Sequence, residues 1–126
     1  MAEKNETGKM GEEVACSYLK VCGYSILHTN WRYGHFELDI VASNGSELVV
    51  VEVKTRSKYS MMEAEDSINR NKIRHIVSAA DAYVRKHKVE LPVRFDILCL
   101  IKDKDTYTVE NHLEDAFYAP VRSIRY

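Results

Sequence analysis

The sequence contains few of the residues that would place it among small secreted proteins. Its 126 residues include only three cysteines and two prolines, and no C-x-x-C pair. An odd and scattered set of thiols excludes a disulfide framework. We therefore expect Cys16, Cys22 and Cys99 to be reduced core thiols of a cytoplasmic protein. No basic segment followed by an apolar run opens the chain, so we expect no secretory signal.

Long apolar runs and paired histidines are also missing. No apolar run approaches the roughly 20 residues that a membrane-spanning helix requires, so we expect no membrane association. The five histidines form neither H-x-x-x-H nor HExxH, which argues against a zinc site. The composition, 45% apolar and 29% charged, is ordinary for a globular protein. We expect one domain over residues 1–126, with about seven flexible residues at its N-terminus.

The hydrophobic pattern predicts an α/β fold. Apolar residues at helical spacing predict helices over residues 8–22 and 67–86. Alternating or continuous apolar stretches predict strands over residues 24–28, 35–43, 47–54, 93–101 and 106–109. The order is αβββαβ with a trailing strand. Residues 47–101 form a β-α-β unit whose strands should run parallel, so we expect a mixed central sheet flanked by helices.

Three carboxylates and one ammonium fall on one face of a predicted hairpin. Asn44-Gly45 is a strong signal for a two-residue turn, and in that register Glu37 lies opposite Glu52. Asp39 then lies opposite Val50 and diagonal to Glu52, and Lys54 shares their face. Facing carboxylates repel one another, and a divalent cation would offset that repulsion. Oxygen ligands of this kind suit Mg²⁺ or Mn²⁺.

The first predicted helix contributes a further carboxylate. On a helical wheel, Glu12 lies at the edge of the apolar face, whereas Glu13 lies on the solvent side. If this helix packs over the sheet, Glu12 reaches toward Asp39 and Glu52, and Glu13 does not.

These residues resemble the D…E-x-K core of the restriction-endonuclease-like, PD-(D/E)xK nucleases, since Asp39 is followed by Glu52-Val53-Lys54. A wider resemblance, over residues 8–117, is to the YraN family of predicted bacterial endonucleases. It is carried by G-K-M-G-E-E-V-A at 8–15, E-L-D-I-V-A at 37–42, V-E-V-K-T-R at 51–56 and R-F-D-I-L at 94–98. Phe36 departs from the pattern, in which a glycine often precedes E-L-D. The chain is also similar to archaeal Holliday-junction resolvases.

The resemblance implies a restriction-endonuclease-like core and metal-assisted hydrolysis of phosphodiester bonds in DNA, branched DNA included. It implies that Asp39 and Glu52 hold Mg²⁺ or Mn²⁺, with the Val53 carbonyl as a further ligand. Lys54 would assist the attacking water, and Glu12 would complete the site or hold a second ion. By analogy with resolvases we expect a homodimer, because cutting both strands of a duplex needs two active sites.

Positive charge begins where the carboxylates end. Residues 54–94 hold ten basic and five acidic residues, whereas residues 1–53 hold four and eight. The candidates for phosphate contact are Arg56, Lys58, Lys72 and Arg74. For the second helix, a solvated basic face is an equally good explanation. Glu37 is a supporting residue beside the carboxylates, and Asp96 either supports the site or pairs with Arg94.

Two interpretations other than an enzyme stay open. An E-x-K on a strand is often a surface salt bridge, and a nuclease-like fold can be kept for binding alone. The first alternative is a nucleic-acid-binding module with little or no cleavage. The second is a protein-interaction scaffold that keeps the acidic residues as a relic. All four positions, Glu12, Asp39, Glu52 and Lys54, hold the residue types that catalysis needs, which favours the nuclease.

Overall fold

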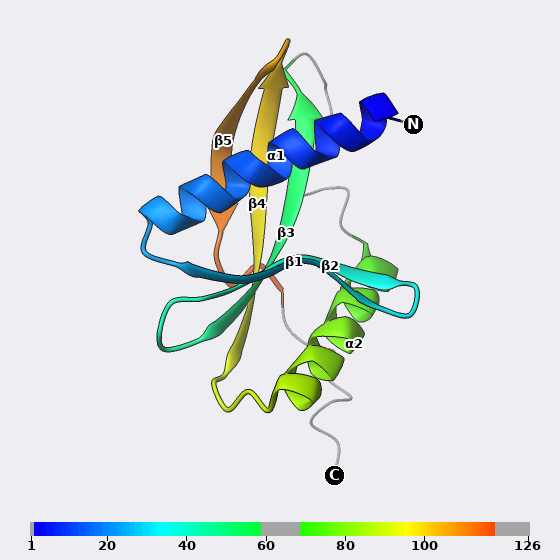
Figure 1. Cartoon of the computed structure of the whole chain (residues 1–126), viewed down its shortest axis with the longest axis vertical. Coiled ribbons are helices and arrows are strands. Elements are labelled where there is room, and N and C mark those ends of the chain that lie inside the picture. Colours follow the sequence, from blue (N-terminus) through cyan, green and yellow to red (C-terminus); the bar gives the residue numbers. More distant parts are fainter. Residues whose placement is uncertain (1, 59–68, 118–126) are drawn as a thin grey trace.

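Five strands form one mixed sheet between two helices (Figure 1). The structure, a computed structural model, describes the backbone of residues 2–58 and 69–117 and the side chains of residues 9–58 and 69–117. Its elements are α1 (Ala2–Val21), β1 (Ser25–Tyr33), β2 (Phe36–Ser43), β3 (Leu48–Ser57), α2 (Arg70–His87), β4 (Val93–Asp103) and β5 (Thr106–Leu113). The strands lie in the order β1-β2-β3-β4-β5, and only β3 and β4 run parallel. The predicted αβββαβ order, trailing strand and mixed sheet are confirmed.

The main differences from the sequence prediction are the ends of elements. α1 begins at Ala2, so the segment expected to be flexible continues the helix. β1 extends to Tyr33 instead of ending at His28. Gly34, with φ 61°, then forms a tight turn with His35 into β2. A glycine suits this turn because its backbone enters the left-handed region without steric strain.

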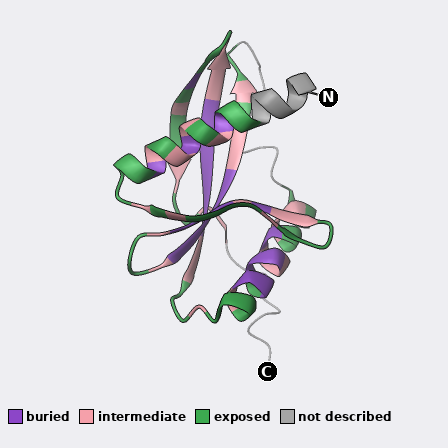
Figure 2. Ribbon diagram, viewed as in Figure 1, coloured by how far each residue is buried: buried purple, intermediate pink, exposed green. Residues whose placement is uncertain are grey.

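The core consists of two layers, one on each face of the sheet. The layer beneath α2 contains Leu38, Val41, Leu48, Val50, Ile76, Ala79, Ala80, Tyr83 and Phe95. The layer beneath α1 contains Ala15, Leu19, Ile40, Ala42, Val49, Val51, Leu98 and Leu100. Successive residues of β3 therefore alternate between the two layers, as expected for a strand covered on both faces. Figure 2 shows buried segments along the central strands and on α2.

The burial of the three cysteines tests the expectation that all of them are core thiols. Cys99 is buried and Cys16 is partly buried, but Cys22 is exposed, so the prediction of a core thiol is wrong there. Cys22 follows Val21, the last residue of α1, where the apolar stripe of the helix no longer determines burial.

Within the described part of the chain, neither helix has the length and apolarity needed to cross a membrane.

The β2–β3 hairpin has a register two residues away from the predicted one. Ile40 pairs with Val51, and the loop between the strands has four residues instead of two. The predicted pairing of Glu37 with Glu52, and that of Asp39 with Val50, is therefore wrong. A shift by an even number of residues keeps each side chain on its own face. Asp39 consequently stays on the face of Glu52 and comes into line with it.

The loop is wider because the side chain of Asn44 closes it. Asn44 Oδ1 accepts hydrogen bonds from the backbone N–H groups of Ser46 and Glu47 at 2.9 and 2.7 Å. Gly45 has φ 95°, whereas Asn44 does not have positive φ. A two-residue type I′ turn needs positive φ at both central residues. Asn44 instead forms a side-chain turn of the kind that asparagine favours.

Candidate functional site

β2 separates from β3 at Asp39, and this separation leaves the backbone N–H of Val53 available to the Asp39 carboxylate. The two strands pair from Ile40 and Val51 toward the loop. Just outside that pairing, the Val53 N–H donates a hydrogen bond to Asp39 Oδ2 at 2.9 Å. Leu38 packs in the α2 layer while Ile40 packs in the α1 layer, so β2 changes layers here. The bend of β2 thus fixes the position of Asp39 beside β3.

Glu52 is deeply buried on β3, on the side of the sheet that faces α2. It is 3% exposed, and Lys72 Nζ of α2 lies 3.3 Å from its Oε1. Its Oε2 is buried without a hydrogen-bond partner among the described residues. Burial and then the charge of Asp39 raise the pKa of Glu52 to about 7, although Lys72 and Lys54 oppose the rise. Glu52 therefore retains the capacity to accept a cation or a proton.

Glu12 and Glu37 lie close enough to Asp39 for their charges to interact. Burial raises the pKa of Asp39, and Glu37 adds to the rise. Burial also raises the pKa of Glu12, against a hydrogen bond at 2.8 Å from Asn30 Nδ2 to its Oε1. The charges of Asp39 and Glu37 push the pKa of Glu12 in the same direction. α1 therefore brings Glu12 to the group that contains Asp39, while Glu13 is exposed.

Four carboxylates interact through their charges, and we call them the acidic cluster: Glu12, Glu37, Asp39 and Glu52. Lys54 follows on β3, and its charge lowers the pKa of both Asp39 and Glu52. Across residues 9–58 and 69–117, no three His, Cys, Asp or Glu side chains are close enough to form a complete metal-binding group. The cluster is thus a set of neighbouring charges, with Lys72 in contact with Glu52.

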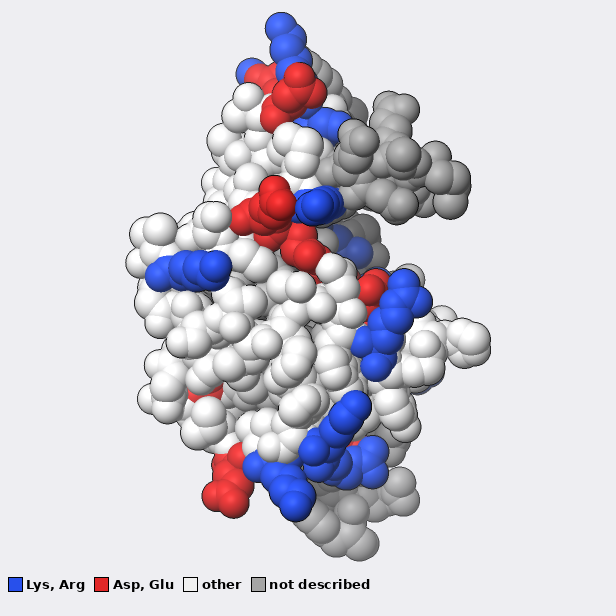
Figure 3. Space-filling model, viewed as in Figure 1, with Lys and Arg blue, Asp and Glu red and all other residues white. Residues whose placement is uncertain are grey.

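Two predicted phosphate contacts are already paired with carboxylates. Arg56 donates to both carboxylate oxygens of Glu110, at 3.2 and 2.7 Å. Lys58 Nζ lies 3.3 Å from Asp103. Arg74 is exposed on α2, and Figure 3 shows basic side chains gathered over this helix. α2 therefore carries exposed positive charge, as does Arg32 of β1, whose side chain is 76% exposed.

Asp96 belongs to a different network, on the α1 side of the sheet. Arg94 donates two hydrogen bonds to its carboxylate, at 2.9 and 2.7 Å. His112 Nε2 lies 2.7 Å away, and the Asp115 N–H donates at 3.0 Å. Burial would raise the pKa of Asp96, but these hydrogen bonds outweigh burial and lower it. Of the two roles considered from the sequence, the structure shows the pairing with Arg94.

Two further residues contact the acidic cluster. Lys72, predicted to point toward the site and to contact phosphate, lies against Glu52. Asn30 was not singled out, yet it binds Glu12 from a backbone position with φ 51°. Asparagine is one of the few residues that tolerate this region, so an asparagine two residues beyond the predicted strand 24–28 is the available signal.

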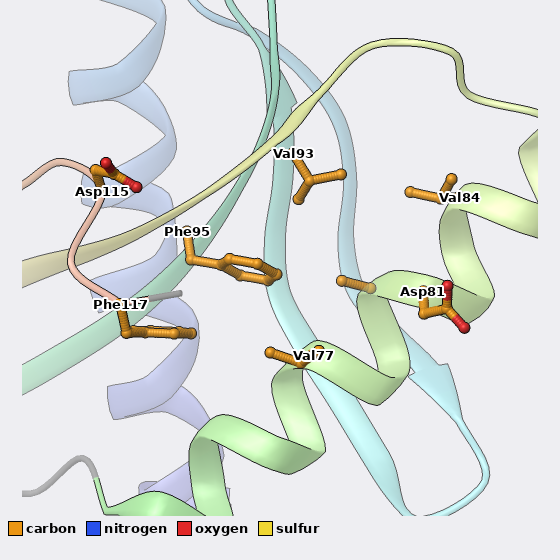
Figure 4. A pocket seen from close by; sticks show the side chains of 8 residues that line it. Val77, Asp81, Val84, Val93, Phe95, Asp115 and Phe117 are labelled. Atoms are coloured by element: carbon orange, nitrogen blue, oxygen red, sulfur yellow. The ribbon is translucent and has the colours of Figure 1, made fainter. Parts of the chain in front are cut away.

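The cavity between α2 and β4 is apolar and lies apart from the acidic cluster. Its volume is about 290 Å³, and it is lined by Val77, Ala80, Asp81, Val84, Val93, Phe95, Asp115 and Phe117. Figure 4 shows Phe95, Phe117 and Val77 around this space, with Asp81 and Asp115 on opposite sides of it. None of these eight residues is a lysine or an arginine. This lining suits an apolar group and not a phosphodiester.

Comparison with known proteins identifies relatives of this chain. A structure of Hjc from Archaeoglobus fulgidus, a Holliday junction resolvase, matches 84% of this chain and 85% of its own with a TM-score of 0.45 and 15% identity. That likeness is too distant to carry an argument about activity.

The sequence matches are much closer. The UPF0102 protein of Parabacteroides distasonis is 55% identical over 97% of this chain and 100% of its own length. That of Bacteroides thetaiotaomicron is 49% identical over 96% of this chain and 99% of its own. The model of a family described as "Uncharacterised protein family UPF0102" matches residues 11–100. The chain therefore belongs to the UPF0102 family, which is the YraN family that its sequence blocks resemble.

Proposed function

We propose that this protein is a metal-dependent endonuclease that hydrolyses phosphodiester bonds in DNA. The observation that supports this most is that Oε2 of Glu52, in the acidic cluster, is buried without a hydrogen-bond partner among the described residues. An apolar residue at this place in the sheet would avoid the desolvation of a carboxylate. Strongly perturbed carboxylates beside cationic side chains are typical of functional sites. The D…E-x-K arrangement of Asp39, Glu52 and Lys54 favours a nuclease among such sites.

The donor set suits Mg²⁺ or Mn²⁺. Hard divalent cations prefer carboxylate oxygens, and a cation beside Asp39 and Glu52 would offset the repulsion between them. Asp39 and Glu52 would hold the ion, and the Val53 carbonyl and Glu12 would be further ligands. When bound, such an ion stabilises the charge that develops on the reacting phosphate.

The chain's own cations would orient the substrate and the attacking water. Lys54 lies two residues after Glu52 on the same strand, where its ammonium would donate a hydrogen bond to the water or to a phosphate oxygen. Arg74 on α2 would contact the DNA backbone. Arg56 and Lys58 would first have to leave Glu110 and Asp103, so we assign them a smaller share of phosphate binding.

A second candidate function is nucleic-acid binding with little or no cleavage. The observation that favours it is that no three potential ligands converge in the described part of the chain. In addition, Lys72 contacts one of the oxygens that a metal ion would need. A binding protein would keep the basic helix α2 but would not require Asp39 and Glu52 to be charged.

The test is cleavage of duplex, single-stranded, flap and four-way-junction DNA, with matching RNA, in Mg²⁺ or Mn²⁺. Asp39→Asn and Glu52→Gln are the informative variants. Asp39→Asn keeps an oxygen that accepts from the Val53 N–H, so it separates lost chemistry from lost structure. Glu13→Gln is the matched control, because Glu13 is exposed one residue from Glu12.

If the protein is a metal-dependent endonuclease, the wild type and Glu13→Gln should cut DNA in the presence of metal, and Asp39→Asn and Glu52→Gln should not. Cutting that persists in both variants would refute the assignment of the site. If the wild type and all three variants bind nucleic acid but none cuts it, the second candidate function would be supported instead. Size-exclusion chromatography with light scattering, with and without DNA, tests the expected homodimer.

A further inference from the structure

Lys72 is the cation that contacts the buried carboxylate of the acidic cluster. Its Nζ lies 3.3 Å from Glu52 Oε1. The Glu52 side chain is 4% exposed, whereas the Lys72 side chain is 43% exposed. The pair therefore joins a fixed, buried anion to a cation that still reaches water.

The backbone of Lys72 is held while its side chain is held weakly. Asn69 caps α2, and its Oδ1 accepts the Lys72 N–H at 2.8 Å. This bond fixes the first turn of the helix and hence the point from which the side chain extends. The contact with Glu52 is longer than the roughly 2.7–2.9 Å of a strong charge-assisted hydrogen bond. Four methylene groups allow the ammonium to turn toward solvent without any movement of α2.

We infer that Lys72 is a positioning residue that acts as a displaceable counter-ion, balancing Glu52 in the metal-free protein and leaving it when a divalent cation binds. This inference rests on the proposed function, because it takes Glu52 as a metal ligand. It changes the role expected for Lys72 from a permanent phosphate contact to an ammonium that is exchanged between two anions.

The exchange couples metal binding to substrate binding. While Lys72 contacts Glu52, it competes with the metal ion for Oε1 and lowers the metal affinity. Once the metal ion neutralises Glu52, the ammonium is free to contact a phosphate beside the same carboxylates. The substrate phosphate then stabilises the state in which Lys72 has left Glu52, so each ligand favours the other.

Removing the ammonium tests the competition directly. Mn²⁺ binding is measured by calorimetry, without DNA, for the wild type, Lys72→Met and Lys86→Met. Lys86→Met is the matched control because Lys86 is exposed near the other end of the same helix. We expect Lys72→Met to bind Mn²⁺ roughly fivefold more tightly, the scale of one partly exposed ion pair. We expect Lys86→Met to stay within about twofold of the wild type.

Thermal unfolding supplies a second readout that a purely structural role would not produce. In EDTA, Lys72→Met should melt below the wild type, because Glu52 loses its partner. At saturating Mn²⁺ the two melting temperatures should converge.

Unchanged or weaker Mn²⁺ binding by Lys72→Met, or a melting deficit that persists in Mn²⁺, would overturn the counter-ion role. Metal-dependent cleavage by the wild type would show that the proposed function survives that result. If the wild type binds no Mn²⁺ at all, the inference and the metal-dependent nuclease both fail.

Discussion

In the metal-free protein, replacing Glu52 by glutamine should raise the free energy of unfolding relative to the wild type, and this gain should be larger at neutral pH than at acid pH. The pKa of Glu52 rises from 4.5 to about 7 because the carboxylate is buried and lies near Asp39. The folded state therefore binds this proton more tightly than the unfolded state does. The contribution of Glu52 to wild-type stability consequently falls as the pH rises from about 4.5 to about 7, and its full penalty is present above that range.

The magnitude follows from the size of the shift. One pKa unit corresponds to about 1.4 kcal/mol, so the carboxylate destabilises the folded state by about 3 kcal/mol above pH 7. Glutamine removes this charge but brings an amide that also needs hydrogen-bond partners. That second contribution does not depend on pH. The change in ΔΔG across the pH range therefore reports the charge of Glu52 together with its interactions with Asp39, Lys72 and Lys54.

Urea denaturation in EDTA at several pH values between 4.5 and 8 provides the assay. The free energy of unfolding of Glu52→Gln, relative to the wild type, should rise by about 3 kcal/mol over this range. Glu13→Gln, an exposed control, should change by less than about 0.5 kcal/mol. A flat difference for Glu52→Gln, or one that falls with pH, would refute the placement of Glu52 in a buried, anionic environment.

Three other substitutions test the catalytic site, the Asp96 network and the packing of α1. Lys54→Ala should lower the single-turnover cleavage rate by roughly 10²–10⁴, and an undiminished rate would remove Lys54 from the mechanism. Arg94→Met should lower the free energy of unfolding by roughly 3–5 kcal/mol, because it leaves Asp96 buried without its main partner. Adding Asp96→Leu should recover part of that loss, and additive losses would contradict the pairing. Gly11→Leu should destabilise by roughly 1–3 kcal/mol in thermal unfolding, since even a Cβ there would lie 3.3 Å from Thr55 Oγ1. A melting temperature equal to the wild type would show that α1 can shift away from the sheet.

The elements of the fold were predictable because their signals are local. The valine run of β3 indicates a strand buried on both faces, and the apolar stripe of α2 indicates one buried helix face. The end of β1 was less predictable. Its polar residues Thr29 and Asn30 lie on an exposed edge strand, where no buried face imposes alternation. Pairing with β2, which the local sequence does not encode, extends this strand.

The acidic cluster was predictable for a similar reason, even though the hairpin register was not. Asn44-Gly45 allows either a two-residue turn or a wider loop closed by the asparagine side chain, and the dipeptide alone does not select between them. Glu47, the last loop residue, bonds with Arg94, which is distant in the chain. The error of two residues preserved the side-chain faces, so Asp39 and Glu52 remained neighbours. An error of one residue would have separated them.

The ion pairs could not be predicted from the sequence. Arg56 was expected to be available for phosphate, but its partner Glu110 lies on β5 and is brought to it only by the order of the strands. The contact of Lys72 with Glu52 depends in the same way on where α2 crosses the sheet. Spacing along the chain predicts which face a charge lies on, whereas its partner depends on packing between elements.

The energetics of Glu52 separate a functional interpretation from a purely structural one. A buried ion pair that served only the fold could be replaced by apolar residues with little loss or with a gain in stability. At Glu52 the raised pKa corresponds to a cost of about 3 kcal/mol above pH 7, and the ammonium groups of Lys72 and Lys54 do not remove it. In the Arg94–Asp96 network, by contrast, the hydrogen bonds outweigh the burial of Asp96. Among the described residues, one buried carboxylate thus has partners that fully balance it and one has partners that do not. The unbalanced carboxylate is the one that a divalent cation would complete, which is why the proposed metal site belongs at Glu52 and not at Asp96.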